Sequence, residues 1–367
     1  NPGTLIIANS LFDNNNATSE KSGAAVYFPS VSILNVTNSN FTKNKAPNGG
    51  VFHLINSNID SQYYFKDCQF KDNEATKNGG AIFFDKPSDV NHISFINSAF
   101  DGNSAVMGGA IYLNDALRSS KYHNIKIESC NFTNNDASTT GKHGGGALYL
   151  SGVEGLNVDD CKFEGNTAMG QGGAVYMNRV SGDVKFTESN FTHNTVPSTA
   201  ADSGIGGAIR FSYSIANATF DECIFRDNHA DVGAGAISVP VPLANEGDQG
   251  TYPNVYQKYT NCKFIDNSAP TSGALTIEEY NVILINDTFD DNSATQGSAA
   301  LILTSIRSLT LQGCNFTNND VTADNGGAIM FNSTVDFVAT ECIFKDNDAV
   351  DGAGIQKIIW SSLLRKS

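Results

Sequence analysis

Charged residues, basic charge and long apolar runs are all scarce in this sequence of 367 residues. Only 17% of the residues are charged, and Leu, Ala, Glu and Lys do not recur at the 3.6-residue spacing that helical repeats require. No apolar run approaches the roughly 18 residues of a membrane-spanning helix, so we expect no membrane insertion by this segment. The formal net charge of -15 and the pI near 4.7 argue against nucleic acid or anionic membrane as partners.

Signals for targeting, metal binding and cofactor chemistry are missing as well. The chain opens at Asn1-Pro2-Gly3 without Met, a basic segment or an apolar signal core, so we expect a mature or trimmed product. No paired zinc-ligand spacing occurs, and the nonapeptide Gly/Asp pattern of calcium-binding β-rolls is absent, so we expect no metal and no cofactor. The six histidines fall at different repeat positions and are interpreted as surface residues: His53, His92, His123, His143, His193 and His229.

What the chain does contain is a Phe-x-x-Asn tetrapeptide that recurs twelve times, with successive phenylalanines 25 to 39 residues apart. The phenylalanines are Phe12, Phe41, Phe70, Phe100, Phe132, Phe163, Phe191, Phe225, Phe264, Phe289, Phe316 and Phe344. The asparagines are Asn15, Asn44, Asn73, Asn103, Asn135, Asn166, Asn194, Asn228, Asn267, Asn292, Asn319 and Asn347. A period near 30 over the whole chain is typical of a solenoid or a propeller, in which each unit buries its apolar face against its neighbours.

Each repeat has the pattern of short strands separated by turns. Between Asp67 and Phe84 the alternation places Cys68 and Phe70 on an inward face, and Gly79-Gly80 allows a sharp bend before a second strand. A third strand, such as Ile125 to Ile127, leads into the next phenylalanine. Three strands and three turns per coil predict an all-β fold, a right-handed parallel β-helix solenoid of about twelve coils. A propeller is the alternative fold, but its blades would need about 40 residues and four antiparallel strands.

The solenoid is expected to form one domain over residues 1–354, because a repeat array grows along one axis around one continuous core. After Gly354 the pattern stops, so residues 355–367 are interpreted as an atypical C-terminal segment, a cap or docking segment around Trp360. The N-terminal end enters the strand-like Leu5-Ile6-Ile7 without an amphipathic cap. Open strand edges at such ends predict end-to-end association with other copies or with further repeats of a longer chain.

The repeated side chains predict internal ladders. We expect the twelve phenylalanines to form one buried stack, each gaining roughly 1.5–3 kcal/mol from burial. An aromatic platform for carbohydrate is the weaker alternative, because each Phe shares its strand face with the inward Cys or Ser position. We expect the twelve asparagines to form an amide ladder, in which the loss of one partner would cost about 1–3 kcal/mol. We therefore expect both ladders to stabilise the fold.

All seven cysteines occupy one register, two residues before the motif phenylalanine. Two interpretations stay open. Stacked neighbours on adjacent coils lie within the distance that a disulfide accepts, which would pair Cys130 with Cys161, Cys223 with Cys262, and Cys314 with Cys342. Alternatively, each cysteine, Cys68 included, is a small apolar filler interchangeable with the serines at the same register, Ser10, Ser39, Ser98 and Ser189.

Together, the tetrapeptides Gly-Gly-Ala-Ile and Phe-x-x-Asn resemble the repeats of the chlamydial polymorphic outer-membrane proteins. Gly-Gly-Ala-Ile stands intact at 79–82, 108–111, 206–209 and 326–329. The resemblance covers the whole chain and implies a right-handed parallel β-helix of the pectin-lyase-like type, used at cell surfaces as an adhesin or structural protein. The repeats are also similar to those of large surface proteins in protists and algae.

Nine Asn-x-Ser/Thr sequons are candidate glycosylation sites: Asn16, Asn35, Asn40, Asn131, Asn190, Asn217, Asn286, Asn315 and Asn332. Four of them, at Asn40, Asn131, Asn190 and Asn315, directly precede a motif phenylalanine. Because that phenylalanine points inward, its neighbours point outward, and these four should stack along one exposed face. The placement favours a eukaryotic secretory route and an N-glycosylated protein that is extracellular or at the cell surface.

The function indicated is therefore a non-catalytic structural glycoprotein: a fibre or filament subunit, a surface coat or an adhesin. The alternative is a polysaccharide-active β-helix enzyme, a lyase or hydrolase, which would need clustered carboxylates, or carboxylates with Arg or Lys, outside the repeat pattern. Asp159-Asp160 and Asp290-Asp291 fall on repeat positions and are interpreted as solvated residues. Glu278-Glu279 is the one acidic pair at a variable position, and it follows the longest insertion, Val241 to Lys258. We expect no enzyme.

Overall fold

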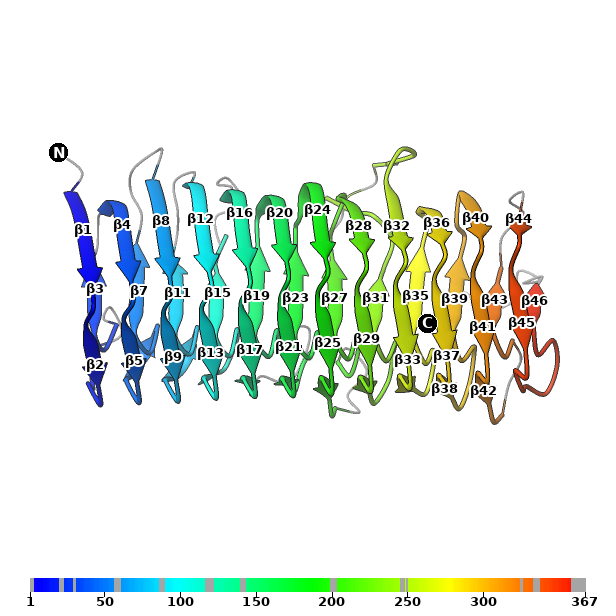
Figure 1. The fold of residues 1–367 in the computed structure, drawn as a ribbon, viewed down its shortest axis with the longest axis horizontal. Coiled ribbons are helices and arrows are strands. Elements are labelled where there is room, and N and C mark those ends of the chain that lie inside the picture. The colour runs from blue at the N-terminus through cyan, green and yellow to red at the C-terminus, as the bar shows by residue number, and fades with distance from the viewer. Residues whose placement is uncertain are drawn as a thin grey trace.

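The chain folds into an elongated all-β solenoid (Figure 1). The computed structural model describes residues 3–19, 23–28, 31–55, 61–85, 90–115, 122–138, 143–198, 203–244, 248, 250–323, 326–332 and 337–357. Within these ranges there are 46 strands and no helix. Every strand pairs in parallel with its counterparts on the neighbouring coils, which confirms the predicted parallel β-solenoid.

Each coil begins in the long-strand sheet, which holds twelve strands. They are β1 (Gly3–Ala8), β4 (Val31–Thr37), β8 (Ser61–Lys66), β12 (Val90–Ile96), β16 (Tyr122–Glu128), β20 (Val153–Asp159), β24 (Ser181–Thr187), β28 (Asn217–Asp221), β32 (Tyr256–Thr260), β36 (Asn281–Ile285), β40 (Ser308–Gln312) and β44 (Phe337–Thr340).

The chain then enters the phenylalanine sheet, whose twelve three-residue strands are centred on the motif phenylalanines. They are β2 (Leu11–Asp13), β5 (Asn40–Thr42), β9 (Gln69–Lys71), β13 (Ala99–Asp101), β17 (Asn131–Thr133), β21 (Lys162–Glu164), β25 (Asn190–Thr192), β29 (Ile224–Arg226), β33 (Lys263–Ile265), β37 (Thr288–Asp290), β41 (Asn315–Thr317) and β45 (Ile343–Lys345).

A short-strand sheet of ten strands follows the motif asparagines. Its strands are β6 (Lys45–Asn48), β10 (Glu74–Asn78), β14 (Ser104–Ala105), β18 (Asp136–Ala137), β22 (Thr167–Ala168), β26 (Thr195–Val196), β30 (His229–Ala230), β34 (Ser268–Ala269), β38 (Ser293–Ala294) and β42 (Asp320–Val321). The prediction of three strands per coil was therefore one too few. Most of these strands have two residues, which is too short for a period-two pattern to show in the sequence.

The post-glycine sheet completes each coil with twelve strands that come after the glycine pairs or their equivalents. They are β3 (Val26–Phe28), β7 (Phe52–Ile55), β11 (Ile82–Asp85), β15 (Ile111–Leu113), β19 (Leu148–Ser151), β23 (Val175–Asn178), β27 (Ile209–Ser212), β31 (Ile237–Val239), β35 (Leu275–Glu278), β39 (Leu301–Thr304), β43 (Ile329–Phe331) and β46 (Ile355–Lys357). Because β46 pairs with β43, the solenoid extends three residues beyond the boundary predicted at 354. Residues 358–367, with Trp360, lie outside the described part of the chain.

The glycine pairs serve the two purposes that their sequence suggests. Gly79 has a φ of +60°, in the left-handed region that L side chains rarely adopt. A Cβ on Gly80 would lie 2.0 Å from the carbonyl oxygen of Gly109 on the next coil. The first glycine therefore turns the backbone, and the second allows adjacent coils to approach each other at this corner.

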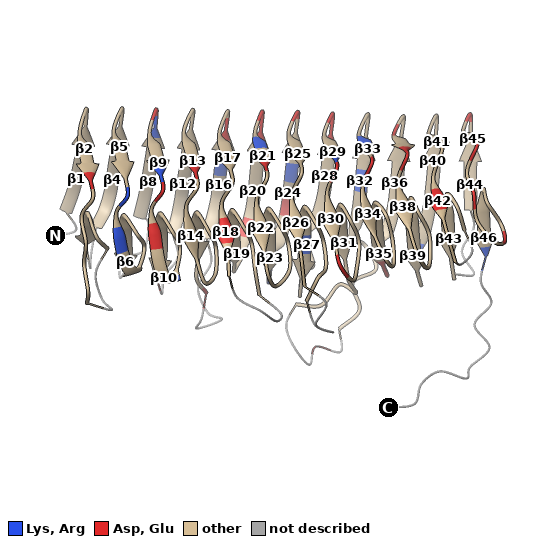
Figure 2. Cartoon of the chain, turned by 90° about the horizontal axis from the view of Figure 1, so that it is seen from below, with Lys and Arg blue, Asp and Glu red and all other residues tan. Residues whose placement is uncertain are grey.

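A left-handed residue also stands before every motif asparagine, which explains the Asn, Asp and Gly at that position. The twelve residues are Asn14, Lys43, Asp72, Gly102, Asn134, Gly165, His193, Asp227, Asp266, Asp291, Asn318 and Asp346. They form the corner between the phenylalanine and short-strand sheets. Figure 2 shows acidic residues recurring along the edge of the solenoid beside the phenylalanine sheet.

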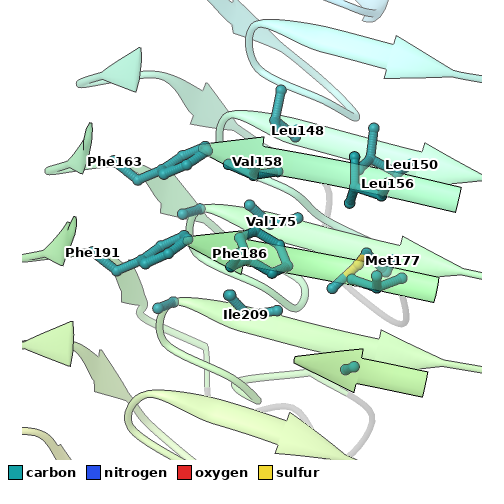
Figure 3. Packing of buried hydrophobic residues seen from close by; sticks show 14 of the residues in the cluster. Leu148, Leu150, Leu156, Val158, Phe163, Val175, Met177, Phe186, Phe191 and Ile209 are labelled. Carbon is teal, nitrogen blue, oxygen red and sulfur yellow. The ribbon is translucent and has the colours of Figure 1, made fainter. Parts of the chain in front are cut away.

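The motif phenylalanines form a continuous stack, as predicted. All eleven consecutive ring pairs are stacked, with centroids 4.6–5.1 Å apart. The ten inner rings are fully buried, whereas Phe12 and Phe344 at the two ends are half-buried. Figure 3 shows Phe163 and Phe191 beside apolar residues of the long-strand and post-glycine sheets, aliphatic ones such as Val158 and the aromatic Phe186, and side chains of both kinds fill the rest of the core. The aromatic-platform alternative is therefore wrong for these residues.

The motif asparagines form the predicted amide ladder. The Asn166 side-chain amide donates to Asn194 Oδ1 and to the carbonyl oxygen of Phe132, both at 2.9 Å. Its own Oδ1 accepts from the backbone and side-chain nitrogens of Asn135, at 3.1 and 3.0 Å. The same pattern repeats along the inner coils, so each buried amide closes a corner and joins three consecutive coils.

The cysteine register requires a small hydrogen-bonding group. Each thiol donates to the carbonyl two residues earlier, as Cys161 does to Asp159 at 3.1 Å. The serines at this register make the same bond, as Ser189 does to Thr187 at 2.8 Å. All seven cysteines are free thiols, so the structure agrees with the filler interpretation and contains none of the three disulfides left open above. Burial raises the pKa of several of these thiols, including Cys314 to about 12.

Candidate functional site

The predicted glycosylation residues all lie on the exterior. Asn40, Asn131, Asn190 and Asn315 occupy the first position of β5, β17, β25 and β41, one column on the outer face of the phenylalanine sheet. Asn40 and Asn131 are exposed, and the other two are half-buried. Of the remaining sequons, Asn16 and Asn286 are exposed, whereas Asn35, Asn217 and Asn332 are half-buried.

The acidic pairs separate into repeat positions and one variable position. Asp160 and Asp291 are left-handed corner residues, and Asp290 accepts a hydrogen bond from Asn318 across the sheet, at 3.0 Å. The two residues of the pair Glu278-Glu279 lie in different environments. Glu279 lies 3.6 Å from Arg307 in an ion pair, whereas Glu278, at the end of β35, lines a cleft.

That cleft arises from a change of residue type along the outer face of the post-glycine sheet. One outward column carries aromatic rings over the first six coils, in register from strand to strand: Tyr27, His53, Phe83, Tyr112, Tyr149 and Tyr176. From His53 onward these rings are at most 8% exposed, and Met107 packs against the rings from Phe83 to Tyr176. His53 is therefore buried, contrary to the prediction that all six histidines are at the surface, because it packs between Tyr27 and Phe83 in this column.

On the next coils the aromatic column ends. Arg210 takes the position after Tyr176, and Ser238 and Thr276 take the two after that. A cleft of about 570 Å³ opens where the aromatic column gives way to Arg210, and Val241 and Leu243 at the start of the long insertion are part of its lining. Its lining comprises His143, Gln171, Tyr176, Asn178, Arg179, Ile205, Arg210, Ser212, Tyr213, Pro240, Val241, Leu243 and Glu278. This volume falls within the roughly 300–1,000 Å³ of small-molecule sites.

The two arginines of the cleft differ in their partners. Arg179 is held in place by the framework, because its guanidinium donates to Ser151 Oγ at 3.2 Å and lies 3.4 Å from the Asp115 carboxylate. Arg210 donates to Ser238 Oγ, and its buried Nε has no protein hydrogen-bond partner. Burial lowers the pKa of Arg210, and the nearby Tyr176 and Glu278 oppose that shift. Burial also raises the pKa of Glu278, although the charge of Arg210 acts in the opposite direction.

Of the histidines, His143 alone is among the residues that line the cleft. His143 contacts Tyr149, with 3.1 Å between Nδ1 and the hydroxyl oxygen, and reaches the rim of the cleft. His229 and Asp231 form a pair at 2.9 Å on a different sheet. Among the residues with described positions, no three His, Cys, Asp or Glu side chains gather as a metal site. The described segments likewise include no helix long and apolar enough to cross a membrane.

Sequence reasoning singled out Glu278 and the insertion but missed Arg179, Arg210 and the aromatic column. The sequence nevertheless contains a signal that could have identified Arg210. Aligning the repeats on their glycine pairs places Tyr176 and Arg210 at the same position, three residues after the second glycine. The change from aromatic to basic becomes visible only when that position is known to face outward.

Comparison with known proteins agrees with the repeat pattern. Residues 67–85 and 160–178 match the family model for the Chlamydia polymorphic membrane protein repeat. The chain is also 28% identical, over 212 residues, to the probable autotransporter YfaL of Escherichia coli strain K12. That alignment covers 55% of this chain and 16% of YfaL, so the chain corresponds to a small part of this relative. No solved structure gives a significant match. The chain thus carries repeats of the Chlamydia polymorphic membrane protein type, as its tetrapeptides predict.

Proposed function

We propose that this chain is a non-catalytic β-solenoid displayed at a cell surface, where it acts as an adhesin or a structural coat. The observation that carries the proposal is the match of residues 67–85 and 160–178 to a membrane-protein repeat, since the Phe-x-x-Asn tetrapeptide that both segments contain recurs twelve times in the chain. The similarity to a probable autotransporter supports the same location. End-to-end continuation with further repeats stays a prediction.

The arrangement of carboxylates supports binding over hydrolysis. Glycoside hydrolysis commonly uses two carboxylates that flank the scissile bond. In the cleft, Glu278 has no second described carboxylate among the lining residues, because Glu279 pairs with Arg307 instead. The enzymatic alternative would gain support if the purified chain cleaved an acidic polysaccharide, measured as new reducing or unsaturated ends.

Surface display is tested on intact cells of the native source. Antibodies raised against this chain should label these cells without permeabilisation, and added protease should remove the label. An antibody against a cytoplasmic protein, which should label only permeabilised cells, serves as the control. If labelling by the anti-solenoid antibodies also required permeabilisation, the surface role would be wrong.

The glycoprotein form of the proposal makes a separate prediction. We expect N-linked glycans on Asn131, Asn190 and Asn315, because each is outward-facing beside a buried phenylalanine and has Thr two residues later. Glycopeptide mass spectrometry of protein from its native source, before and after glycosidase treatment, measures this directly. Three unmodified sites would remove the main support for a glycan-coated surface while leaving surface display itself intact.

A further inference from the structure

The floor of the cleft separates one cation from one carboxylate. Arg210, Ser238 and Thr276 are consecutive in one column, and Pro240 directly follows Val239, which is in register with Ile277 beside Glu278. Arg210 and Glu278 thus stand two coils apart and two residues apart along the strand direction, which is about 12 Å at the backbone. The small side chains of Ser238 and Pro240 lie between them. This span accommodates one sugar-sized ring.

Arg210 and Glu278 have unused bonding capacity toward that space. No ion pair joins Arg210 to any described residue, and its Nε has no protein partner. Glu278 makes no ion pair or hydrogen bond with the described residues, although it is close enough for Arg210 to affect its pKa. Arg179 on the adjacent coil also has a buried Nε without a partner, but its guanidinium already forms an ion pair with Asp115 and a hydrogen bond with Ser151. Arg210 and Glu278 are therefore available to bind a ligand in the cleft, whereas Arg179 is already bonded to other coils of the solenoid.

The charged, hydrogen-bonding and apolar side chains that line the cleft indicate which class of ligand it can bind. A guanidinium presents a planar fork of donors that matches a carboxylate. Glu278 opposes dianions such as phosphate esters, as does the net charge of -15, but its carboxylate can accept hydrogen bonds from hydroxyl groups. Tyr213, Val241 and Leu243 add an apolar wall, which suits the less polar face of a sugar ring.

We propose that this cleft binds a carboxylate-bearing sugar, a uronic or sialic acid residue of a glycan. Arg210 binds the carboxylate, and Glu278 accepts hydrogen bonds from the hydroxyl groups. This inference deepens the proposed surface role and rests on it, because glycans of this class are met at cell surfaces and in the surrounding matrix.

The test uses the purified 367-residue chain and titration calorimetry. The probes are the methyl glycosides of glucuronic acid and N-acetylneuraminic acid, which distinguish the two sources of the carboxylate. The controls are methyl glucoside, acetate and inorganic phosphate. We expect at least one acidic sugar to bind more tightly than all three controls, and Arg210→Gln to weaken that binding about ten-fold or more. Arg210→Lys should restore it only in part, because Lys lacks the planar fork.

Two further variants keep the result interpretable. Arg226→Gln removes an exposed arginine of β29 on the phenylalanine sheet and should leave binding unchanged. Glu278→Gln should weaken binding of the acidic sugar without changing the thermal melting curve, since Glu278 bonds to no framework group. The proposal is overturned if acidic sugars bind no better than methyl glucoside or acetate, or if a well-folded Arg210→Gln variant binds normally. Absence of surface labelling on cells would contradict the proposed function and leave the measured sugar binding standing.

Discussion

Replacing Phe163 with Ala should lower the free energy of unfolding by about 3–5 kcal/mol. The Phe163 ring is fully buried and lies between Phe132 at 4.9 Å and Phe191 at 4.6 Å. Those neighbours are fixed by strand pairs and asparagine bonds on their own coils, so they cannot collapse into the space that the ring leaves. Urea denaturation followed by circular dichroism measures the loss.

Phe12→Ala is the matched control for this prediction. Phe12 contacts a stacked ring on one side only, Phe41 at 5.1 Å, and it is half-buried at the end of the array. Its loss should therefore cost less than the loss of Phe163, because less apolar surface is returned to water. Equal and negligible shifts for both variants would contradict the assignment of the stack to the core.

The fold was predictable because its determinants are local and repeated. Phe163 and Asn166 belong to a motif that returns on every coil, so their inward direction follows from strand alternation and from the period alone. The short-strand sheet was not predictable in the same way, since a strand such as Thr167–Ala168 is defined by bonds to the coils above and below.

The cleft was predictable only in part, because it depends on what each coil places beside the next. Glu278 was singled out as an acidic residue outside the repeat pattern, whereas Arg210 lies on a strand that fits the pattern. Its significance comes from the end of the aromatic column at Tyr176 and from the small Ser238 that follows. A single repeat carries neither piece of information.

One residue breaks the cysteine register, and its environment leads to a pH-dependent prediction. Asp287 takes the position two residues before Phe289 that cysteine or serine holds on the other coils. It is fully buried, and its carboxylate accepts from the backbone nitrogens of Cys262 at 2.7 Å and Ile285 at 3.1 Å. Burial raises the pKa of Asp287 to about 7, with a small addition from the charge of Asp221, and the two backbone bonds offset only part of that rise.

The sign of the effect follows from the proton count. In the unfolded chain Asp287 titrates near a pKa of about 3.9, so between about pH 4 and pH 7 the folded state holds a proton that the unfolded state has released. The stability that Asp287 contributes is therefore fully present below about pH 4 and is lost as the pH rises through about 7. A shift of about three pKa units corresponds to a loss of roughly 4 kcal/mol.

Asp287→Ser should remove this pH dependence while keeping the hydrogen bond from the Cys262 backbone nitrogen. At Ile285 the Ser hydroxyl would donate to the carbonyl oxygen, in place of the bond that Asp287 accepts from the backbone nitrogen. Ser189 at the same register accepts from the backbone of Cys161 at 3.1 Å and donates to Thr187 at 2.8 Å, so Ser has the geometry that the position requires. The pKa values of Asp136, Asp266 and Glu278 are also raised by burial, but these groups are common to both proteins. Only the difference between the two stability curves therefore reports on Asp287.

We expect the variant to gain about 4 kcal/mol relative to the natural sequence between pH 4 and pH 8, measured by urea denaturation at each pH. Asp291→Ser is the control, because Asp291 is an exposed corner residue of the same coil as Asp287, and its curve should stay nearly parallel to that of the natural sequence. Parallel curves for Asp287→Ser as well would mean that Asp287 ionises normally inside the core. Two backbone N–H groups would then be enough to stabilise a buried carboxylate in a register that otherwise holds only neutral side chains.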